Sequence, residues 1–172
     1  MVYVAFLRGI NVGGRIIKMS ELKACFEKNG FENVSTLLQT GNVMFSHSEK
    51  NTDKLKEVIE QMLSEQFEYP AKTQVISLES LKGIVAANPF TGATADYHSY
   101  VIFIENNLEA ELVAETGEQL GEEVRAGQGV VYWKVQKGKT LKSPLAKLLT
   151  KSKYKQFNTT RNINTLQKLI GL

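Results

Sequence analysis

The sequence predicts an α+β protein with two antiparallel sheets, and three observations support this prediction. Residues 2–76 alternate apolar runs with helical stretches in the order β-α-β-β-α-β, the ferredoxin-like unit or α/β-plait. The rest of the chain nearly repeats this order of elements without repeating the residues. A length of 172 residues suits one domain or two small ones. We therefore expect tandem ferredoxin-like halves at 1–78 and 79–172.

The first half begins with a strand, a glycine-rich loop and a helix. Val2–Leu7 is β-branched, aromatic and apolar throughout, which is typical of a central buried strand. After the loop, Ser20 is the predicted N-cap of a helix that ends at Asn29-Gly30, where glycine permits a left-handed residue. The side chains expected on the inner face of this helix are Leu22, Cys25 and Phe26.

A hairpin, a second helix and a fourth strand complete the first half. Val34–Leu38 and Val43–Ser46 are predicted to pair around a turn at Gln39–Asn42. Asn51 or Thr52 is expected to cap the following helix, and Thr73–Ile76 forms the last strand. The inner face of the helix is predicted to carry Leu55, Val58, Ile59, Met62 and Leu63.

The second half follows a connecting helix that Ser77 caps and that ends before Pro89, because the residue preceding proline disfavours helix. Residues 91–99 are the expected boundary loop. The strands are predicted at Tyr100–Ile104, Glu122–Arg125 and Val130–Val135. Three helices are expected, one led by Asn107, one beginning at Ser143-Pro144, and a last one bearing Ile163, Leu166, Leu169 and Ile170.

Composition and charge indicate a soluble cytoplasmic protein. The apolar runs are much shorter than a bilayer requires, the N-terminus lacks the pattern of a signal peptide, and Cys25 is the single cysteine. Charge is distributed unevenly, because residues 79–123 carry nine acids and one base whereas residues 125–172 carry eleven bases and no acid. This asymmetry indicates either an anionic partner or lysines that only solvate the last elements.

The glycine-rich loop after the first strand is the first candidate site. It brings backbone N–H groups together with arginines at Arg8 and Arg15, which suits a phosphate or carboxylate. The loop lacks the Lys-Ser/Thr of a P-loop and the Gly-x-Gly-x-x-Gly of a dinucleotide site, and it also fits a plain turn. The predicted ligand contacts here are Arg8, Gly9, Asn11, Gly13 and Gly14.

Two further polar segments supply candidate contacts. The hairpin turn adds Thr40 and Asn42, although a turn alone explains both residues. Near the C-terminus, Thr160, Arg161 and Asn162 stand where a strand meets a helix, whose N-terminus favours anions. Thr160 or Asn162 is expected to be the N-cap of that helix, which leaves the other polar residues for a ligand.

Other chemistry has little support in the sequence. His47 and His98 have no metal-ligand spacing, Cys25 falls on an apolar helix face, and Glu122 and Glu123 face opposite sides of a strand. We expect no metal and no cofactor, and the sequence leaves open whether the protein is an enzyme. The expected partner is a small anionic ligand, and no membrane partner is expected.

Two alternatives use the charged segments. The lysines of the C-terminal third alternate with aromatic residues, among them Tyr132, Trp133 and Tyr154, which is compatible with nucleic-acid binding by stacking and phosphate contact. No RNP1-like run is present, which weakens this interpretation. Alternatively, the acidic segment at 105–123 of one copy meets the basic segment of another, so we expect a monomer or a weak dimer.

The polar segments together resemble an uncharacterised bacterial family, the domain of unknown function 1697. The resemblance runs from the first strand to the last helix and implies a cytoplasmic protein with two α/β-plait halves, but no reaction. Two departures are Ile163, where the family usually has tryptophan, and Thr40, where it usually has serine. The motifs that carry it are Leu7-Arg8-Gly9-Ile10-Asn11-Val12-Gly13-Gly14, Met19-x-Glu21-Leu22, Gly30-Phe31, Thr40-Gly41-Asn42-Val43-x-Phe45, Asn88-Pro89-Phe90 and Thr159-Thr160-Arg161-Asn162-x-Asn164-Thr165.

Overall fold

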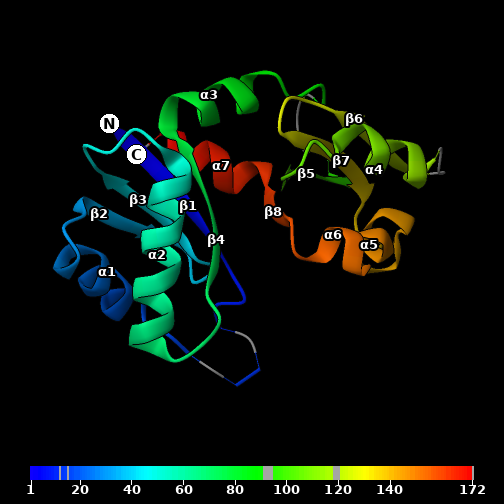
Figure 1. Cartoon of the computed structure of the whole chain (residues 1–172). Coiled ribbons are helices and arrows are strands. Elements are labelled where there is room, and N and C mark those ends of the chain that lie inside the picture. The colour runs from blue at the N-terminus through cyan, green and yellow to red at the C-terminus, as the bar shows by residue number, and fades with distance from the viewer. Residues whose placement is uncertain (12, 15, 91–94, 118–120, 172) are drawn as a thin grey trace. The chain divides into compact units, whose positions relative to one another are not determined.

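The chain folds into two units, Met1–Leu81 and Lys82–Leu172, each built on a four-stranded antiparallel sheet (Figure 1). The predicted α+β class with two antiparallel sheets is therefore confirmed. The computed structural model describes residues 1–11, 13–14, 16–90, 95–117 and 121–171. Part of the expected boundary loop, residues 91–94, lies outside this range.

The first unit has the strand order β2-β3-β1-β4, with β1 in the interior of the sheet. Strand β1 pairs with both β3 and β4, and β2 pairs with β3 through a bulge between Glu32 and Ser35. Its elements in chain order are β1 (Val2–Arg8), α1 (Met19–Lys28), β2 (Glu32–Leu37), β3 (Asn42–Ser46), α2 (Thr52–Phe67) and β4 (Lys72–Ser77), followed by α3 (Leu78–Ala86) across the division.

The helices of the first unit begin differently from one another. Asn51 caps α2, where its side chain accepts hydrogen bonds from the N–H groups of Asp53 and Lys54. In α1 the N-cap is Lys18 rather than the predicted Ser20, and Lys18 makes no side-chain capping bond. Ser20 lies inside the first turn, because the carbonyl of Lys18 already accepts the N–H of Leu22.

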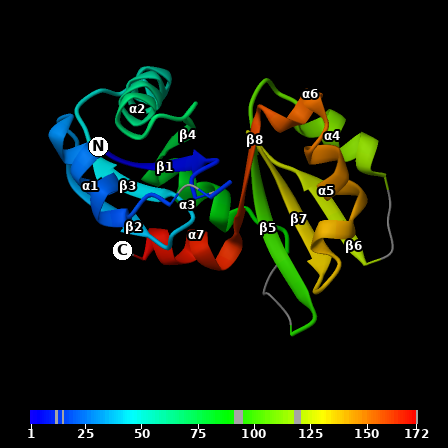
Figure 2. The same cartoon turned by 90° about the horizontal axis from the view of Figure 1, so that it is seen from below.

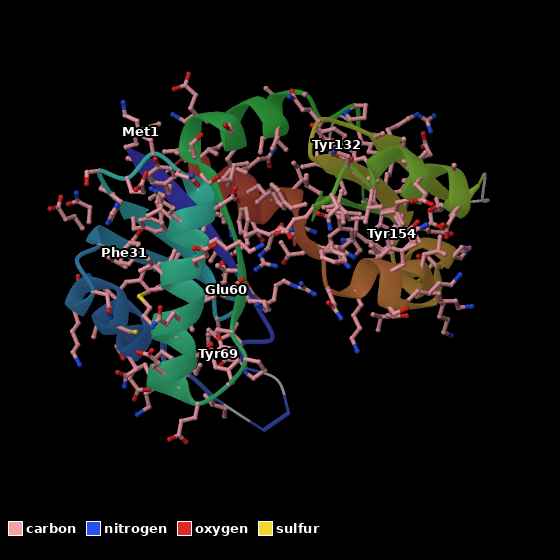
Figure 3. All side chains as sticks on the ribbon, viewed as in Figure 1. Met1, Phe31, Glu60, Tyr69, Tyr132 and Tyr154 are labelled. Carbon is pink, nitrogen blue, oxygen red and sulfur yellow. The ribbon has the colours of Figure 1, made fainter. Side chains whose placement is uncertain are left out.

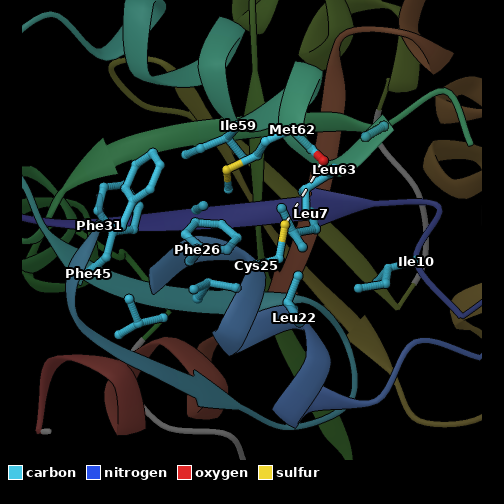
Figure 4. Close-up of a cluster of buried hydrophobic side chains, with 14 of the residues drawn as sticks. Leu7, Ile10, Leu22, Cys25, Phe26, Phe31, Phe45, Ile59, Met62 and Leu63 are labelled. Carbon is cyan, nitrogen blue, oxygen red and sulfur yellow. Dashed lines mark hydrogen bonds between the residues drawn. The ribbon is translucent and has the colours of Figure 1, made fainter. Parts of the chain in front are cut away.

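Both helices of the first unit bury their apolar faces on the same face of the sheet (Figure 4). Leu22, Cys25 and Phe26 are buried in α1, as predicted. In α2, Leu55, Ile59, Met62 and Leu63 are buried as predicted, but Val58 is 49% exposed and lies at the edge of the stripe. Phe26, Phe31 and Phe45 form a cluster of ring contacts at the centre of this core.

The second unit has the strand order β6-β7-β5-β8, with β8 at one edge. Strand β5 pairs with β7 on one side and β8 on the other, all antiparallel. It begins at Tyr97, three residues before the predicted start. The elements in chain order are β5 (Tyr97–Ile104), α4 (Glu109–Thr116), β6 (Glu122–Ala126), β7 (Val130–Gln136), the 3-10 helix η1 (Thr140–Lys142), α5 (Pro144–Leu149), α6 (Ser152–Lys155), β8 (Asn158–Asn162) and α7 (Ile163–Ile170).

Capping residues position the helices of the second unit. Ser143 caps α5 by accepting the N–H of Ala146, with proline at the first helical position, as predicted. Asn162 caps α7 by accepting the N–H of Asn164, which decides between the two expected caps. For α4 the N-cap is Leu108, and Asn107 precedes it with a φ of 54°.

Helices α4, α5 and α6 cover one face of the second sheet (Figure 2). This face carries alternate residues of the strands, among them Ile102, Val131 and Trp133. Tyr154 of α6 is fully buried there, and Figure 3 shows it labelled beside the helices. Its hydroxyl donates to Glu115 of α4 over 2.9 Å, which joins α6 to α4.

Candidate functional site

Three segments of the first unit lie at the same end of its sheet. Phe6, near the end of β1, pairs with Asn42, the first residue of β3, and Arg8 pairs with Lys72, the first residue of β4. Because the strands are antiparallel, the loop after β1, the β2–β3 turn and the approach to β4 meet at this end. We call residues 9–17 the glycine loop; its Val12 and Arg15 lie outside the described residues.

The β2–β3 turn sits directly against the start of the glycine loop. The N–H of Leu7 donates to the carbonyl of Gly41 over 2.8 Å, and Gly41 is buried with a φ of +76°. A Cβ at Gly41 would lie 2.7 Å from Ile10 Cγ2 and 2.9 Å from Leu7 Cβ. Ile10 is itself buried and belongs to the hydrophobic core (Figure 4).

Asn11 ties the glycine loop to the turn. Its Oδ1 accepts the N–H of Ile17 over 2.6 Å, and its Nδ2 donates to the carbonyl of Gln39 over 3.0 Å. Asn11 also adopts a φ of 56°, in the left-handed region that asparagine tolerates better than most residues. The amide therefore closes the loop on itself and fastens it to the neighbouring turn.

The glycines predicted as contacts are on the surface of the loop. Gly9, Gly13 and Gly14 are exposed, each with a positive φ, and a Cβ on any of them would meet nothing within 4 Å. The space beside their backbone is therefore free of other atoms of the described chain. Backbone N–H groups in such turns can approach a ligand closely.

The two turn residues predicted as ligand contacts, Thr40 and Asn42, differ in exposure. Asn42 is fully buried, and its Nδ2 donates to the carbonyl of Leu37 and to Thr40 Oγ1, both over 2.9 Å. Thr40 is exposed at the tip. The Asn42 side chain therefore holds the shape of the turn, while a ligand in solvent can reach Thr40.

Charges of both signs lie at this end of the sheet, among them Glu21 in the first turn of α1. Arg8 is half-buried at the end of β1, and Lys18 is exposed at the start of α1. Glu60 of α2, labelled in Figure 3, accepts from Lys72 Nζ over 2.8 Å and from the N–H of Thr73 over 3.0 Å. Sequence reasoning missed Lys72 as a neighbour of Arg8, although the pairing of the first and fourth strands of this unit implies it.

The C-terminal candidates lie in the second unit, on edge strand β8. Thr160 and Asn162 pair with Ile102 and Tyr100, whose side chains belong to the helix-covered face, so Arg161 between them projects from the other face. Arg161 Nη1 donates to Thr159 Oγ1 over 2.8 Å and to the carbonyl of Thr160 over 3.0 Å. Burial lowers the pKa of Arg161 to about 10, so it remains charged at neutral pH.

The remaining titratable groups of the described residues form no metal-binding set. Across the described ranges, no three His, Cys, Asp or Glu side chains gather closely enough to hold a metal ion. His47 Nδ1 accepts the N–H of Glu49. Burial raises the pKa of the Cys25 thiol, and a protonated thiol in the core is a poor nucleophile.

The comparisons with known proteins give a family and a fold. The family model described as a protein of unknown function, DUF1697, matches residues 1–132. A conserved bacterial protein from Streptococcus pneumoniae has a similar structure, with a TM-score of 0.79 and 24% identity over 99% of this chain and 97% of its own. No curated protein matches the sequence. In the part of the chain that the structure describes, no helix is long and apolar enough to cross a membrane. The chain belongs to the DUF1697 family.

Proposed function

We propose that the first unit binds a small anionic ligand, bearing a phosphate or a carboxylate, at the glycine loop. The observation that carries the proposal is the double hydrogen bond of Asn11, to Ile17 and to Gln39. It fastens Asn11 to the end of the loop at Ile17 and to the neighbouring turn. Backbone that is held in place before binding loses little conformational entropy when a ligand binds, and this favours affinity.

The backbone of the loop supports an anion rather than a cation or an apolar ligand. Gly9 and Asn11 have positive φ values on either side of Ile10, which does not, and such alternation turns successive N–H groups toward one concave point. The loop leads directly into α1, whose N-cap makes no side-chain bond. The positive end of the α1 dipole and its first N–H groups add to the attraction.

Side chains contribute charge and orientation in this proposal. Arg8 supplies a guanidinium at the end of β1, suited to two parallel bonds with a carboxylate or phosphate. The exposed hydroxyl of Thr40 is a further donor from the turn. Asn11 and Asn42 act by holding the loop and the turn in shape. Thr160, Arg161 and Asn162 remain predicted contacts from the second unit, which substitution tests separately.

We also propose that the two units are ferredoxin-like halves of a cytoplasmic protein that is a monomer or a weak dimer. The strand orders β2-β3-β1-β4 and β6-β7-β5-β8 support two ferredoxin-like halves, because each unit runs β-α-β-β-α-β along the chain. A single buried thiol, Cys25, suits the reducing conditions of the cytoplasm. Lys153 binds Glu111 and Glu115 of its own chain, which favours a monomer or weak dimer over pairing of these charges between copies.

Thermal-shift and calorimetric titrations test the binding. The probes are inorganic phosphate, a nucleoside monophosphate, a sugar phosphate and a dicarboxylate. A true ligand stabilises the folded protein by about 2.7 kcal/mol at a hundredfold excess over its Kd. Arg8→Ala should weaken binding by about 10- to 100-fold, because a charge-assisted hydrogen bond contributes about 1.5–3 kcal/mol.

The matched control is Lys50→Ala, which removes the same charge from an exposed position of the first unit. Lys50 follows the end of β3, whose last residue pairs with Val2 at the opposite end of β1 from the glycine loop. Equal losses in Arg8→Ala and Lys50→Ala would show that affinity follows net charge alone. Stabilisation by none of the four probes would overturn the proposal, and unchanged binding in Arg161→Ala would show that Arg161 is not a ligand contact.

A further inference from the structure

A basic segment of the second unit lies outside the proposed site. Residues 137–155, which we call the lysine segment, contain seven lysines and no acidic residue. The segment includes η1, α5 and α6. All seven lysines are exposed; they are Lys137, Lys139, Lys142, Lys147, Lys151, Lys153 and Lys155.

The lysine segment is a folded surface and not a loose tail. Leu145, Leu148 and Tyr154 anchor it to the core of the second unit, and Ser143 caps α5. Because Leu145, Leu148 and Tyr154 face the sheet, the lysines between them are held on the outer side. Charges on a fixed scaffold bind a regular polyanion with less loss of entropy than charges on a disordered chain.

Helix α4 balances part of this positive charge. Lys153 forms ion pairs with Glu111 and Glu115 of α4, and the charge of Lys151 also helps to lower the pKa of Glu115. Lys139, Lys142 and Lys147 take part in none of the salt bridges found among the described residues. Lys139, Lys142, Lys147 and Lys151 project from η1, α5 and their flanking turns. A surface of this kind raises the local concentration of polyanions and speeds their association.

Three aromatic side chains in or near the segment, those of Tyr132, Trp133 and Tyr154, are too deeply buried to stack on bases. Tyr132 and Trp133 are at most 4% exposed, and Tyr154 is fully buried. The hydroxyl of Tyr132, labelled in Figure 3, donates to the carbonyl of Ile84 over 2.8 Å. The alternation of lysines with aromatics in the sequence therefore reflects a buried face and an exposed face. It is not a stacking platform of the kind that single-stranded RNA binders use.

We infer that the lysine segment binds nucleic acid through the phosphate backbone, without reading bases. The charge is suited to a polyanion, and the absence of exposed aromatic rings from the described part of the segment removes base stacking. An anionic membrane is the weaker fit, because Leu141 is the one large hydrophobic residue exposed in the segment, as far as the structure describes it. One apolar side chain inserts too little surface to anchor a protein.

Fluorescence anisotropy with the full chain tests this inference. The probes are a labelled duplex DNA, a labelled single-stranded RNA and vesicles that contain phosphatidylserine. We expect both nucleic acids to bind at about 50 mM salt, and the duplex affinity to fall with a log–log slope of about −0.9 per phosphate contacted. Duplexes of different sequence should bind equally.

The informative variant removes three charges from the segment, Lys142→Ala, Lys147→Ala and Lys151→Ala together. It should weaken duplex binding at least tenfold and make the salt slope less steep by about 0.9 for each phosphate that is no longer neutralised. The control removes three exposed lysines of the first unit, at 28, 50 and 54. Equal weakening in the control, binding to vesicles alone, or no nucleic-acid binding at about 50 mM salt would each overturn the inference.

Discussion

Gly41 is the residue on which the contact between the turn and the glycine loop depends. An alanine there would need a φ of +76° and would bring its Cβ to 2.7 Å from Ile10 and 2.9 Å from Leu7. We expect Gly41→Ala to lower the free energy of unfolding by about 2–4 kcal/mol, from backbone strain and overpacking together. Urea unfolding followed by circular dichroism measures the change.

Gly13→Ala is the matched control for that prediction. Gly13 has a similar φ of +64°, but an added Cβ meets nothing within 4 Å. Strain alone should then cost about 1 kcal/mol. If both variants lost the same stability, the packing of the turn against Leu7 and Ile10 would not be what Gly41 is required for.

Single residues show where sequence reasoning reaches its limit. The charge, the glycine content and the position of the loop can be read from the sequence, and they predict Asn11 as a ligand contact. Its bond to Gln39 joins residues that are 28 positions apart in the chain, which no local pattern reveals. Asn42 is similar, because its complete burial follows from strand pairing and not from its own chemistry.

At the scale of elements, the two helices of the first unit offer a direct comparison of capping. Asn51 accepts two N–H groups of α2, whereas Lys18 makes no side-chain bond at α1. Asn51→Ala should therefore cost about 1 kcal/mol, and Lys18→Ala should cost close to nothing. Thermal unfolding of both variants against the parent measures the difference, and a comparable loss in Lys18→Ala would contradict the assignment of caps.

Elements were predictable where the pattern of apolar residues was strong. The inner faces of α1 and α2 and the cap of α5 follow from spacing and local chemistry alone. The end of the chain is harder to predict, because the sequence indicates only that a strand meets a helix near Thr160, Arg161 and Asn162. Strand β8 in fact continues to Asn162, and its alternation sends Arg161 to the opposite face from Thr160.

At the scale of the whole molecule, the carboxylates of Glu49, Glu115 and Glu123 have pKa values that folding lowers. The backbone N–H of Asn51 lowers the pKa of Glu49, and the hydrogen bond from Lys153 lowers that of Glu115. The pKa of Glu123 is lowered chiefly by its hydrogen bond from Lys134. These contacts tie a loop to a helix, a helix to a helix and a strand to a strand, so both units share the effect.

The sign of the resulting pH dependence follows from linkage. A carboxyl whose pKa is lower in the folded protein than its ordinary value of 4.5 stabilises the fold above that value. The contribution is lost as the pH falls from there through the lower folded pKa. We therefore expect the urea concentration at the unfolding midpoint to stay constant through neutral pH and to decrease below about pH 4.5.

Lys134→Ala should make this decrease at acid pH, the acid limb, less steep because Glu123 loses its hydrogen-bond partner, whereas Lys28→Ala should leave it unchanged. An acid limb that is the same in all three proteins would show that the Lys134–Glu123 pair contributes nothing to acid sensitivity.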